Sequence, residues 1–333
     1  MSILITGGAG YIGSHMAWAL QDAGEQFIVM DRLSTGFAAA PPRAATLIRA
    51  DIGDLDVLRK TLAAHKVESI IHFAGSVVVP DSVAAPLDYY ENNTSKSRML
   101  IEAAVEAGVR HFVFSSTAAV YGTPEAPAVS EDAPLRPESP YGRSKLMTEM
   151  MLRDAAHAHG LKFGVLRYFN VAGADPQGRA GQATKGATHL IKAAVETALG
   201  KRDQLSIFGA DYPTPDGTCV RDFIHVSDLI EAHLLTLRHL RAGGESVTLN
   251  CGYGRGFSVR QVIDAVRRVS GVAFRVTEAP RRPGDPASIV ANAGRAREAL
   301  GWTPQFDDLD RIVADALAWE RSERLREVTS SAQ

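Results

Sequence analysis

The sequence SILITGGAGYIG (Ser2–Gly13) joins an apolar run to a glycine-rich turn. The apolar residues of Ser2–Thr6 predict a strand, and the stretch from Tyr11 to Ala23 predicts a helix. Glycine permits a tight turn and the close approach of a phosphate, while the start of the helix offers unpaired N–H groups. A glycine turn alone is common, but the order strand, turn, helix predicts a site for a dinucleotide pyrophosphate. The predicted contacts are Gly7, Gly10, Tyr11, Ile12 and Gly13.

An acidic residue ends the second predicted strand, Gln26–Asp31. A carboxylate at this point can accept hydrogen bonds from the adenosine ribose and would repel a 2′-phosphate, so Asp31 favours NAD over NADP. The neighbouring Arg32 weakens that preference. The simpler interpretation of Asp31 is an acidic residue at the end of a strand that binds no ligand. The preceding glycine turn argues against that interpretation.

Further short apolar runs alternate with helical stretches through the first half of the chain. Strands separated by helices in this way predict an α/β protein with a parallel, doubly wound Rossmann sheet. The strands are expected at Thr46–Ala50, Ser69–Ala74, His111–Ser115 and Phe163–Arg167. Residues that end two of these strands are further expected cofactor contacts, namely Asp51 and Ile52 at the adenine and the backbone of Phe73, Ala74 and Gly75 along the cofactor.

The second half of the sequence is less regular and carries loops rich in glycine, proline and threonine. Its short strands and helices predict a smaller C-terminal α/β substrate domain. We expect residues 1–170 to form the NAD-binding domain together with late elements from about 219–247. Residues 171–325 would form most of the substrate domain, and 326–333 would be a frayed tail.

The composition excludes several classes of protein. The 333 residues carry a formal net charge of -2, which gives no overall attraction for nucleic acid. No apolar run reaches the ~20 residues of a membrane span, and no leader-like segment precedes the first strand, so a cytoplasmic protein is expected. Cys219 and Cys251 form no disulfide framework, and no Cys/His cluster has the spacing of a metal site.

A second motif, SPYGRSK (Ser139–Lys145), lies near the middle of the chain. Pro140 suits the first turn of a helix, and residues four apart share a helix face, so Tyr141 and Lys145 point the same way. A surface aromatic beside a surface cation is the plainer interpretation. Thr117, however, follows a strand of the same sheet, and ligands gather at the carboxyl ends of parallel strands. A lysine ammonium and a positive nicotinamide ring favour the phenolate, so Tyr141 is a predicted general base.

Several longer segments together resemble the extended short-chain dehydrogenase/reductase family and, within it, the UDP-glucose 4-epimerases. The resemblance runs from residue 2 to about 320 and rests on GGAGYIGSH, HFAG, YYENN, FSSTAAVYG, SPYGRSK, RYFNVAGA, IFGADYPTPDGTCVRDFIHV and RRPGD. It implies tightly held NAD and the interconversion of UDP-galactose and UDP-glucose, a step of galactose metabolism, through a transient 4-keto sugar nucleotide. It also implies a homodimer paired through helices at about 89–107 and 141–157. The seam would involve Met99, Ala103, Ala107, Met147, Met150 and Met151.

The resemblance implies a role for each catalytic residue. Tyr141 would take the proton from the sugar 4-hydroxyl, and Thr117 would hydrogen-bond the 4-oxygen. Lys145 would hold the nicotinamide ribose and lower the pKa of Tyr141. The further cofactor contacts that the resemblance implies are Asn92, Ser115 and Tyr168, beside Tyr141 and Lys145 themselves.

The nucleotide end of the substrate maps onto later motifs. Arg221 and Arg282 would grip the phosphates, because guanidinium forks match phosphate oxygens. Asp285 would bind the uridine ribose, Phe208 would lie near the uracil, and Asn170 would contact the sugar or diphosphate. A solvated surface cation is the plainer interpretation of either arginine alone. The full set of implied substrate contacts is Thr117, Tyr141, Asn170, His189, Leu190, Phe208, Arg221, Arg282 and Asp285.

Three positions bear on the details of cofactor and substrate binding that the resemblance implies. Val77 stands where some relatives have a cofactor-binding lysine, and His189 stands where many have an asparagine against the substrate. Ile289 aligns with a residue that gates sugar size. Its branched aliphatic side chain suggests a pocket for hexoses without an N-acetyl group.

The residues after Thr117 separate this sequence from related enzymes. Nucleotide-sugar dehydratases carry an acidic pair directly after the threonine, and decarboxylases of UDP-glucuronate carry a glutamate close by, whereas this chain has Ala118 and Ala119. A 4-epimerase needs no such acid. The alternatives are a 4-epimerase of another UDP-sugar (UDP-xylose/UDP-arabinose or a UDP-N-acetylhexosamine), a net dehydrogenase, and a non-catalytic NAD-binding regulator. Proteins of the last class usually lose the tyrosine or the lysine, and this chain keeps both.

Overall fold

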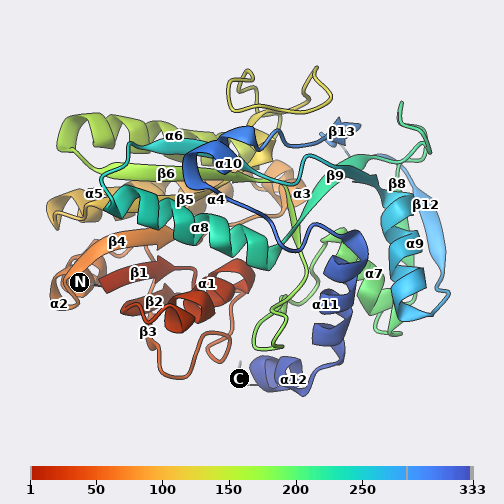
Figure 1. Ribbon diagram of the computed structural model, residues 1–333, viewed down its shortest axis with the longest axis horizontal. Coiled ribbons are helices and arrows are strands. Elements are labelled where there is room, and N and C mark those ends of the chain that lie inside the picture. The colour runs from red at the N-terminus through yellow and green to blue at the C-terminus, as the bar shows by residue number, and fades with distance from the viewer. Residues whose placement is uncertain (1, 283, 331–333) are drawn as a thin grey trace.

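A computed structural model describes residues 2–282 and 284–330, and its centre is a seven-stranded sheet (Figure 1). The strand order is β10-β6-β5-β4-β1-β2-β3, and every neighbouring pair is parallel. The strands are β1 (Ser2–Thr6), β2 (Phe27–Asp31), β3 (Thr46–Arg49), β4 (Val67–His72), β5 (His111–Thr117), β6 (Lys162–Tyr168) and β10 (Val247–Cys251). The predicted doubly wound Rossmann sheet is therefore confirmed.

Helices cover both faces of the sheet, because successive strand residues point to opposite sides. Ile3 and Ile5 share one apolar core with Met16, whereas Leu4 shares another with Leu58. The first face carries α1 (Tyr11–Asp22) and α8 (Val226–Arg241), and the second carries α2 (Leu55–Ala64), α5 (Lys96–Glu106) and α6 (Pro140–His159). Among the described residues, no helix is both long and apolar enough to cross a membrane.

The order of the strands determines where a ligand can bind. Strand β1 lies between β4 and β2. The chain passes from β1 to β2 and β3 on one side and then returns to β4 on the other. At this change of direction a crevice opens at the carboxyl ends of the strands. The glycine turn follows β1, Asp31 ends β2, and Thr117 ends β5. All three therefore lie along the same edge of the sheet.

A π-helical turn interrupts the helix that the sequence predicts over about 89–107. This turn, η1 (Tyr90–Ser95), stands between α4 (Pro86–Tyr89) and α5. The amide of Asn93 anchors it, since Oδ1 accepts from the Ser76 N–H at 2.7 Å and Nδ2 donates to the Ser76 carbonyl at 2.9 Å. Turns of this kind occur frequently at functional sites, and this one is tied to the segment that follows β4.

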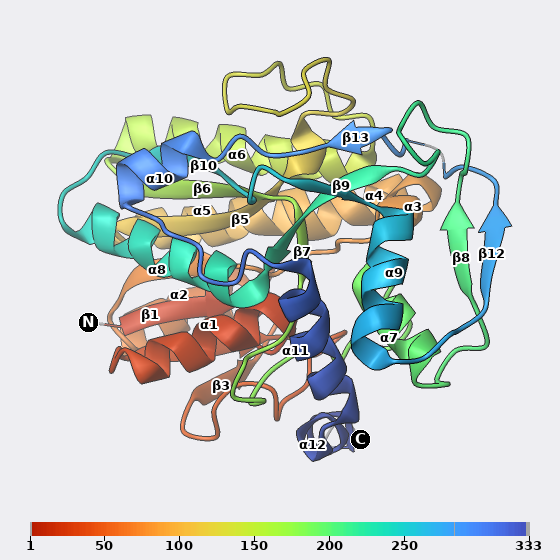
Figure 2. The same ribbon diagram turned by 45° about the vertical axis from the view of Figure 1, so that its right-hand side comes forward.

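The later part of the chain builds a smaller region beside the central sheet. Figure 2 shows β8 and β12 standing apart from that sheet, with α7 and α9 beside them. Strands β7, β9, β11 and β13 form a second small sheet. The elements of this region are β7 (Asn170–Ala172), α7 (Leu190–Ala198), β8 (Leu205–Phe208), β9 (Val220–His225), β11 (Gly256–Ser258), α9 (Val259–Ser270), β12 (Val276–Ala279), β13 (Ser288–Ile289) and α11 (Leu309–Arg321). Three short elements lie elsewhere, namely α3 (Val79–Ala84), η2 (Ala118–Val120) and α10 (Gly294–Leu300).

The elements of 219–247 are divided between the two regions, which differs from the predicted boundary. Strand β9 belongs to the small sheet, whereas α8 covers the central sheet. Strand β10 pairs with β6 as far as Cys251. The predicted range therefore included a strand of the smaller region and ended before the strand that completes the large sheet. We retain the two-domain division as a proposal, with β10 on the NAD side.

A final helix, α12 (Glu323–Ser330), lies where the sequence predicts a frayed tail at 326–333. Leu325 and Val328 are only 8% and 1% exposed. They share an apolar cluster with Phe37, Ala40, Ala174 and Trp319. The polar residues that suggested fraying lie on the outer side of an amphipathic helix, so the prediction was wrong up to residue 330. Residues 331–333 lie outside the described part of the chain.

Candidate active site

The turn between β1 and α1 requires glycine at two positions. Gly7 has φ +71°, and a Cβ there would lie 2.6 Å from the backbone nitrogen of Ala74. A Cβ on Gly13 would overlap the carbonyl oxygen of Gly7. The absence of side chains therefore lets the helix and the end of β4 close tightly around the turn.

The first turn of α1 offers unpaired donors to a phosphate. Its N-cap is Gly10, which supplies no capping side chain. The N–H groups of Tyr11, Ile12 and Gly13 have no acceptor within the helix, and the helix dipole adds partial positive charge. The Tyr11 hydroxyl is used elsewhere, since it donates to the Gly173 carbonyl at 2.7 Å. These free donors above a side-chain-free turn fit the pyrophosphate of NAD.

The Asp31 carboxylate lies beside the glycine turn. Its Oδ2 accepts from the Ala9 N–H at 3.0 Å, and its Oδ1 accepts from the Leu33 N–H at 2.8 Å. Burial raises the pKa of Asp31, and these two hydrogen bonds oppose the rise. The guanidinium of Arg32 pairs with Asp51 at 3.1 Å. Because that arginine already has an acidic partner, the site fits NAD better than NADP.

Asp51, a predicted adenine contact, is held by protein groups. It accepts from Lys96 Nζ at 2.6 Å and from the Gly53 N–H at 2.8 Å. Burial alone would raise the pKa of Asp51, but the hydrogen bonds from Lys96, Gly53 and Arg32 hold it below its usual value. Ile52 is 6% exposed and packs in the core under α2. A contact of either residue with adenine stays a prediction.

The segment after β4 runs between the glycine turn and the catalytic helix. The Phe73 N–H donates to the Thr6 carbonyl at 2.9 Å, which continues the strand pairing. A Cβ on Gly75 would lie 3.0 Å from Asn93 Oδ1 and 3.4 Å from Lys145 Nζ. The predicted cofactor contacts Phe73, Ala74 and Gly75 therefore lie between the glycine turn and the helix that begins with the SPYGRSK motif.

A buried chain of polar groups supports this segment, and sequence reasoning missed it. His72 Nδ1 lies 2.6 Å from Thr6 Oγ1, and Nε2 lies 2.9 Å from Ser97 Oγ. The Ser97 hydroxyl donates to the Asn93 carbonyl at 2.5 Å. The predicted cofactor contact Asn92 stands next to this chain and donates to a serine hydroxyl at 2.9 Å. The paired asparagines in YENN were the signal that could have indicated it.

Helix α6, which carries the predicted catalytic residues, begins at Pro140 for local reasons. Ser139 Oγ accepts from a backbone N–H of the first turn at 3.1 Å, and Pro140 occupies the first helical position. Lys145 is 3% exposed, and its Nζ donates to the Ser115 carbonyl at 3.0 Å. Burial lowers the pKa of Lys145 to about 8. Tyr141 precedes Lys145 by one helical turn on the same face.

The side chains of Tyr141 and Thr117 are hydrogen-bonded to each other. Burial raises the pKa of Tyr141, and the bond to Thr117 lowers it. The lysine ammonium donates to the Ser115 carbonyl, and a lowering of the Tyr141 pKa by Lys145 stays a prediction. Thr117 Oγ1 also accepts from the Ala119 N–H at 3.1 Å, which starts the short turn η2.

A buried ion pair lies directly under the catalytic helix. Arg167 Nη2 lies 2.6 Å from Glu149 Oε2, and the two side chains are 1% and 0% exposed. Ser116 Oγ donates to the same carboxylate at 2.5 Å. Glu149 stands one turn after Lys145, so the pair ties the catalytic face of α6 to β5 and β6. Sequence reasoning missed this pair. The signal that could have indicated it is that Glu149 follows Lys145 by four residues, which puts both on one face of the helix.

Ser115 and Tyr168 meet at the carboxyl ends of β5 and β6. Their side chains are hydrogen-bonded, and the Tyr168 hydroxyl also lies 2.7 Å from His233 Nε2. The His233 ring in turn lies 4.9 Å from the ring of Phe73. Both predicted cofactor contacts are therefore fixed in the crevice by α8.

The predicted nucleotide contacts gather in the smaller region. Arg221 Nη2 lies 3.6 Å from Asp285 Oδ1, and the Arg282 guanidinium stacks 3.8 Å from the ring centre of Phe208. Tyr212 stands nearby, and its buried hydroxyl has no hydrogen-bond partner among the described residues. Two cations, a carboxylate and an aromatic face suit a nucleoside diphosphate. Tyr212 was missed, although it lies within the motif that contains Phe208 and Arg221.

The predicted contacts Asn170, His189 and Leu190 line one small cavity of about 20 Å³. This volume suits a water molecule and not a sugar. Ile289 is 7% exposed and packs in a cluster with Ala118 and Phe169, which places it near Thr117.

The predicted residues thus fall into two groups. The cofactor and catalytic residues line the carboxyl edge of the central sheet, and the nucleotide contacts lie on the smaller region. Val77, which stands where some relatives have a cofactor-binding lysine, comes two residues after Gly75 and is 50% exposed. In the described part of the chain, no three His, Cys, Asp or Glu side chains cluster as metal ligands.

Known proteins resemble this chain in sequence and in structure. Residues 3–252 match the NAD dependent epimerase/dehydratase family. A UDP-glucose 4-epimerase of Azospirillum brasilense is 59% identical over 320 residues, which cover 96% of this chain and 92% of that protein. A UDP-glucose 4-epimerase from Brucella ovis in complex with NAD is 41% identical, with a TM-score of 0.92 and coverage of 95% and 97%.

A UDP-Glc/GlcNAc 4-epimerase from Campylobacter jejuni is 48% identical, with a TM-score of 0.84 and coverage of 96% and 99%. The likeness therefore extends over both the central sheet and the smaller region. The glycine turn that fits NAD lies inside the matched residues. From its sequence, its fold and the geometry of this crevice, the chain belongs to the NAD dependent epimerase/dehydratase family.

Proposed function

We propose that this protein is a UDP-glucose 4-epimerase, which interconverts UDP-galactose and UDP-glucose through a transient 4-keto sugar nucleotide and retains its NAD. One observation carries the proposal: Tyr141 is hydrogen-bonded to Thr117 one helical turn from the buried Lys145, beside a glycine turn that fits NAD. Relatives that bear this name align along nearly the whole chain. Ala118 and Ala119 leave no acid to expel water.

Proton transfer at the sugar 4-oxygen is assigned to Tyr141 and Thr117. A 4-hydroxyl placed between them gives its proton to the Tyr141 phenolate while Thr117 orients the oxygen. Burial disfavours that phenolate, so a nearby positive charge is needed to stabilise it. NAD, when bound, supplies that charge and takes up and returns the hydride of sugar C4.

Lys145 orients the cofactor in this proposal. An ammonium has three N–H donors, and the Ser115 carbonyl takes one of them. The other two can bind ribose hydroxyls of NAD. Asp31 and the first turn of α1 hold the adenosine and pyrophosphate ends in the same way, with protein groups that are already in position.

The nucleotide end keeps the substrate attached while the sugar turns. The 4-keto sugar must show its other face before it is reduced again, so the UDP needs an anchor at a distance from the chemistry. Arg221 and Arg282 supply two cations for the diphosphate, and Phe208 supplies an aromatic face for the base. Asp285 can accept from the uridine ribose.

The test is incubation of the purified protein with UDP-galactose, without added NAD, and chromatographic separation of the products. Catalytic formation of UDP-glucose is expected, and Tyr141→Phe should slow it about 10³-fold. If no UDP-glucose forms even after NAD is supplied, the hexose assignment is wrong, and UDP-arabinose and UDP-N-acetylhexosamines are tried next. If NADH accumulates with a stable oxidised product, the protein is a net dehydrogenase. Binding of NAD without any turnover would instead indicate a regulator.

We also propose that two copies pair through α5 and α6. Met147 and Met150 are 41% and 54% exposed on α6, which leaves apolar surface for a partner. Ala103 is fully buried in the core, so it is removed from the expected seam. Light scattering should give the mass of a dimer for the wild type and of a monomer for Met150→Glu. A cytoplasmic location stays a prediction.

A further inference from the structure

His189 stands at the N-cap of α7 with one ring nitrogen paired. Its Nδ1 lies 2.8 Å from Gln182 Nε2. An amide nitrogen can only donate, so Nδ1 is the acceptor and the proton of the neutral ring is on Nε2. No described residue accepts from that Nε2–H. Desolvation of the ring lowers the pKa of His189, which favours the neutral form, although the residue as a whole is exposed.

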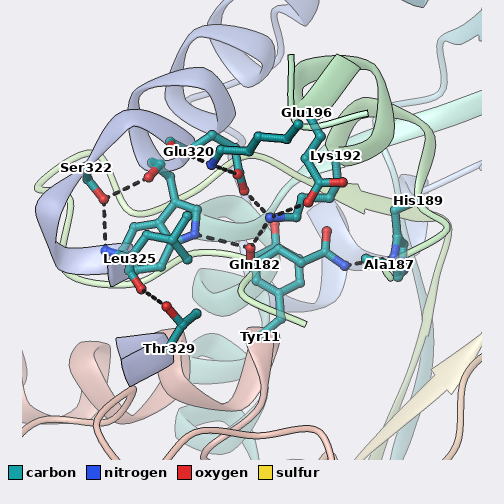
Figure 3. A network of polar contacts seen from close by, with 12 residues as sticks. Tyr11, Gln182, Ala187, His189, Lys192, Glu196, Glu320, Ser322, Leu325 and Thr329 are labelled. Atoms are coloured by element: carbon teal, nitrogen blue, oxygen red, sulfur yellow. Dashed lines mark hydrogen bonds and ion pairs between the residues drawn. The ribbon is translucent and has the colours of Figure 1, made fainter. Parts of the chain in front are cut away.

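Gln182 is itself fixed by a buried network (Figure 3). It is 8% exposed, and its backbone carbonyl accepts from Lys192 Nζ at 2.9 Å and from Trp319 Nε1 at 3.2 Å. Lys192 is 7% exposed and pairs with Glu320 and, at 3.2 Å, with Glu196. Figure 3 shows these side chains converging from α7, from α11 and from the loop that precedes α7.

Three groups hold the Lys192 ammonium. It donates hydrogen bonds to Glu320 and to the Gln182 carbonyl, and it forms an ion pair with Glu196. A buried ion pair by itself is weak evidence for stability, because desolvation of both charges offsets their attraction. The distinctive effect of this lysine is to fix the backbone of Gln182, and through it the amide that faces His189.

His189 shares a cavity with residues of β7 and β9, and β9 also carries Arg221 of the proposed nucleotide site. His189 lines the same cavity as Asn170 and Phe223, and these two residues are register partners in β7 and β9. Phe223 is two residues from Arg221, so both side chains stand on the same face of β9. A donor on His189 is therefore placed toward the strand that carries a proposed phosphate-binding arginine.

We propose that Lys192 and Glu320 are positioning residues that, through Gln182, hold His189 as its Nε2–H tautomer, and that this N–H donates to an acceptor oxygen of the UDP moiety. The tautomer is a property of the protein alone. The identity of the acceptor rests on the proposed function. The two claims can therefore fail separately.

The tautomer is tested by NMR of substrate-free protein labelled with 15N-histidine. The His189 signals are identified by their loss in His189→Asn. The wild type should show the Nε2–H pattern, and Gln182→Leu should show a mixture of the two tautomers. A wild-type ring with its proton on Nδ1, or one that exchanges freely between tautomers, would overturn the proposal whether or not the protein epimerises UDP-galactose.

The hydrogen bond to the nucleotide is tested by calorimetry with UDP. Gln182→Leu should weaken UDP binding about three- to tenfold, the size expected for one neutral hydrogen bond. The loss should appear in KM for UDP-galactose more than in kcat. In a His189→Asn background, Gln182→Leu should have no further effect. An equal loss in both backgrounds would show that Gln182 does not act through His189.

The ion pair needs variants that keep the protein folded. Lys192→Met with Glu320→Leu replaces the buried charges by apolar groups of similar size, and it should still weaken UDP binding three- to tenfold. Lys201→Met is the matched control, because Lys201 also pairs with Glu320, at 2.8 Å, but is 43% exposed and does not contact Gln182. It should leave UDP binding unchanged. Wild-type affinity in the folded double variant would make the pair purely structural.

Discussion

The two ends of the crevice are built by different means. At the catalytic end, Lys145 is 3% exposed and its helix is tied to the central sheet by the buried pair Glu149–Arg167. At the nucleotide end, Arg221 and Asp285 are 12% and 33% exposed, 3.6 Å apart, and carried by short strands and loops. Proton transfer needs atoms at fixed distances, whereas a nucleotide that must bind and leave needs charge with access to solvent. Substitutions at the first end should therefore change rate or folding, and substitutions at the second should change affinity.

The largest effect is expected at the catalytic phenol. Tyr141→Phe removes the proposed general base, so kcat with UDP-galactose should fall about 10³-fold. The Kd for UDP should hardly change, because UDP lacks the sugar that meets Tyr141. Steady-state kinetics and calorimetry measure the two quantities. A variant that keeps near-normal kcat would place the base elsewhere.

The next effect concerns folding at the same end. Arg167→Met leaves the buried Glu149 with the more exposed Arg153, at 3.1 Å, as its remaining cationic partner. Because the buried arginine is lost, the free energy of unfolding should fall by about 3–5 kcal/mol in urea titrations. Arg59 is the matched control, since it makes the same two-pronged contact with Glu106, at 2.7 and 2.9 Å, with both side chains more than 40% exposed. Arg59→Met should cause no measurable change. Similar losses in both variants would show that burial is not the decisive difference.

A smaller effect is expected at the nucleotide end. Arg282→Ala removes a cation stacked on Phe208, and the Kd for UDP should rise about ten- to a hundredfold, as for the loss of one charged hydrogen bond. The unfolding midpoint in urea should stay where it is. Arg281 is the neighbouring control, because it pairs with the exposed Asp211 at 2.7 Å. If Arg281→Ala weakens UDP binding as much as Arg282→Ala does, the loss is not specific to the proposed nucleotide contact, and the expected difference between the two ends of the crevice is refuted.

A last effect, spread over more than two pH units, is a pH dependence of stability that comes from Lys145 in the protein without cofactor. Its folded pKa of about 8 lies below the ~10.4 of an unfolded lysine, so between these values the unfolded state binds more protons. Stability should rise with pH across this window, by at most about 1.4 kcal/mol per pH unit, and level off outside it. Urea titrations of wild type and Lys145→Met from pH 7 to 10 isolate the contribution. A difference that does not vary with pH would refute it.

Local patterns predicted the parts of the site that are continuous in the chain. The glycine turn, Asp31 and the Tyr141/Lys145 spacing each follow from a short motif whose geometry is set by its own strand or helix. The parallel, doubly wound character of the central sheet followed from the alternation of its strands with helices, whereas the order of the strands was not predicted. The features that were predicted need no knowledge of distant contacts.

The remaining features depend on residues far apart in sequence. Lys192 and Glu320 are 128 residues apart, so no local pattern connects them. Helix α12 carries only Leu325 and Val328 as buried apolar residues, too few to predict a helix until the cluster that covers them is known. Strand β9 fell within the range of about 219–247 that the sequence assigned to the NAD-binding domain, because its pairing with β7, β11 and β13 depends on residues far away in the chain.

The position of β10 in the sequence has a consequence during synthesis. This strand pairs with β6, yet it leaves the ribosome about 80 residues later. At typical translation rates of ~5–20 residues per second, the delay is roughly 4–16 s. During that time β6 is an open edge with unpaired N–H and C=O groups, the kind of edge that recruits strands from other chains. The nascent protein is therefore most prone to aggregate after its NAD-binding half has emerged and before residue 251 is free to fold.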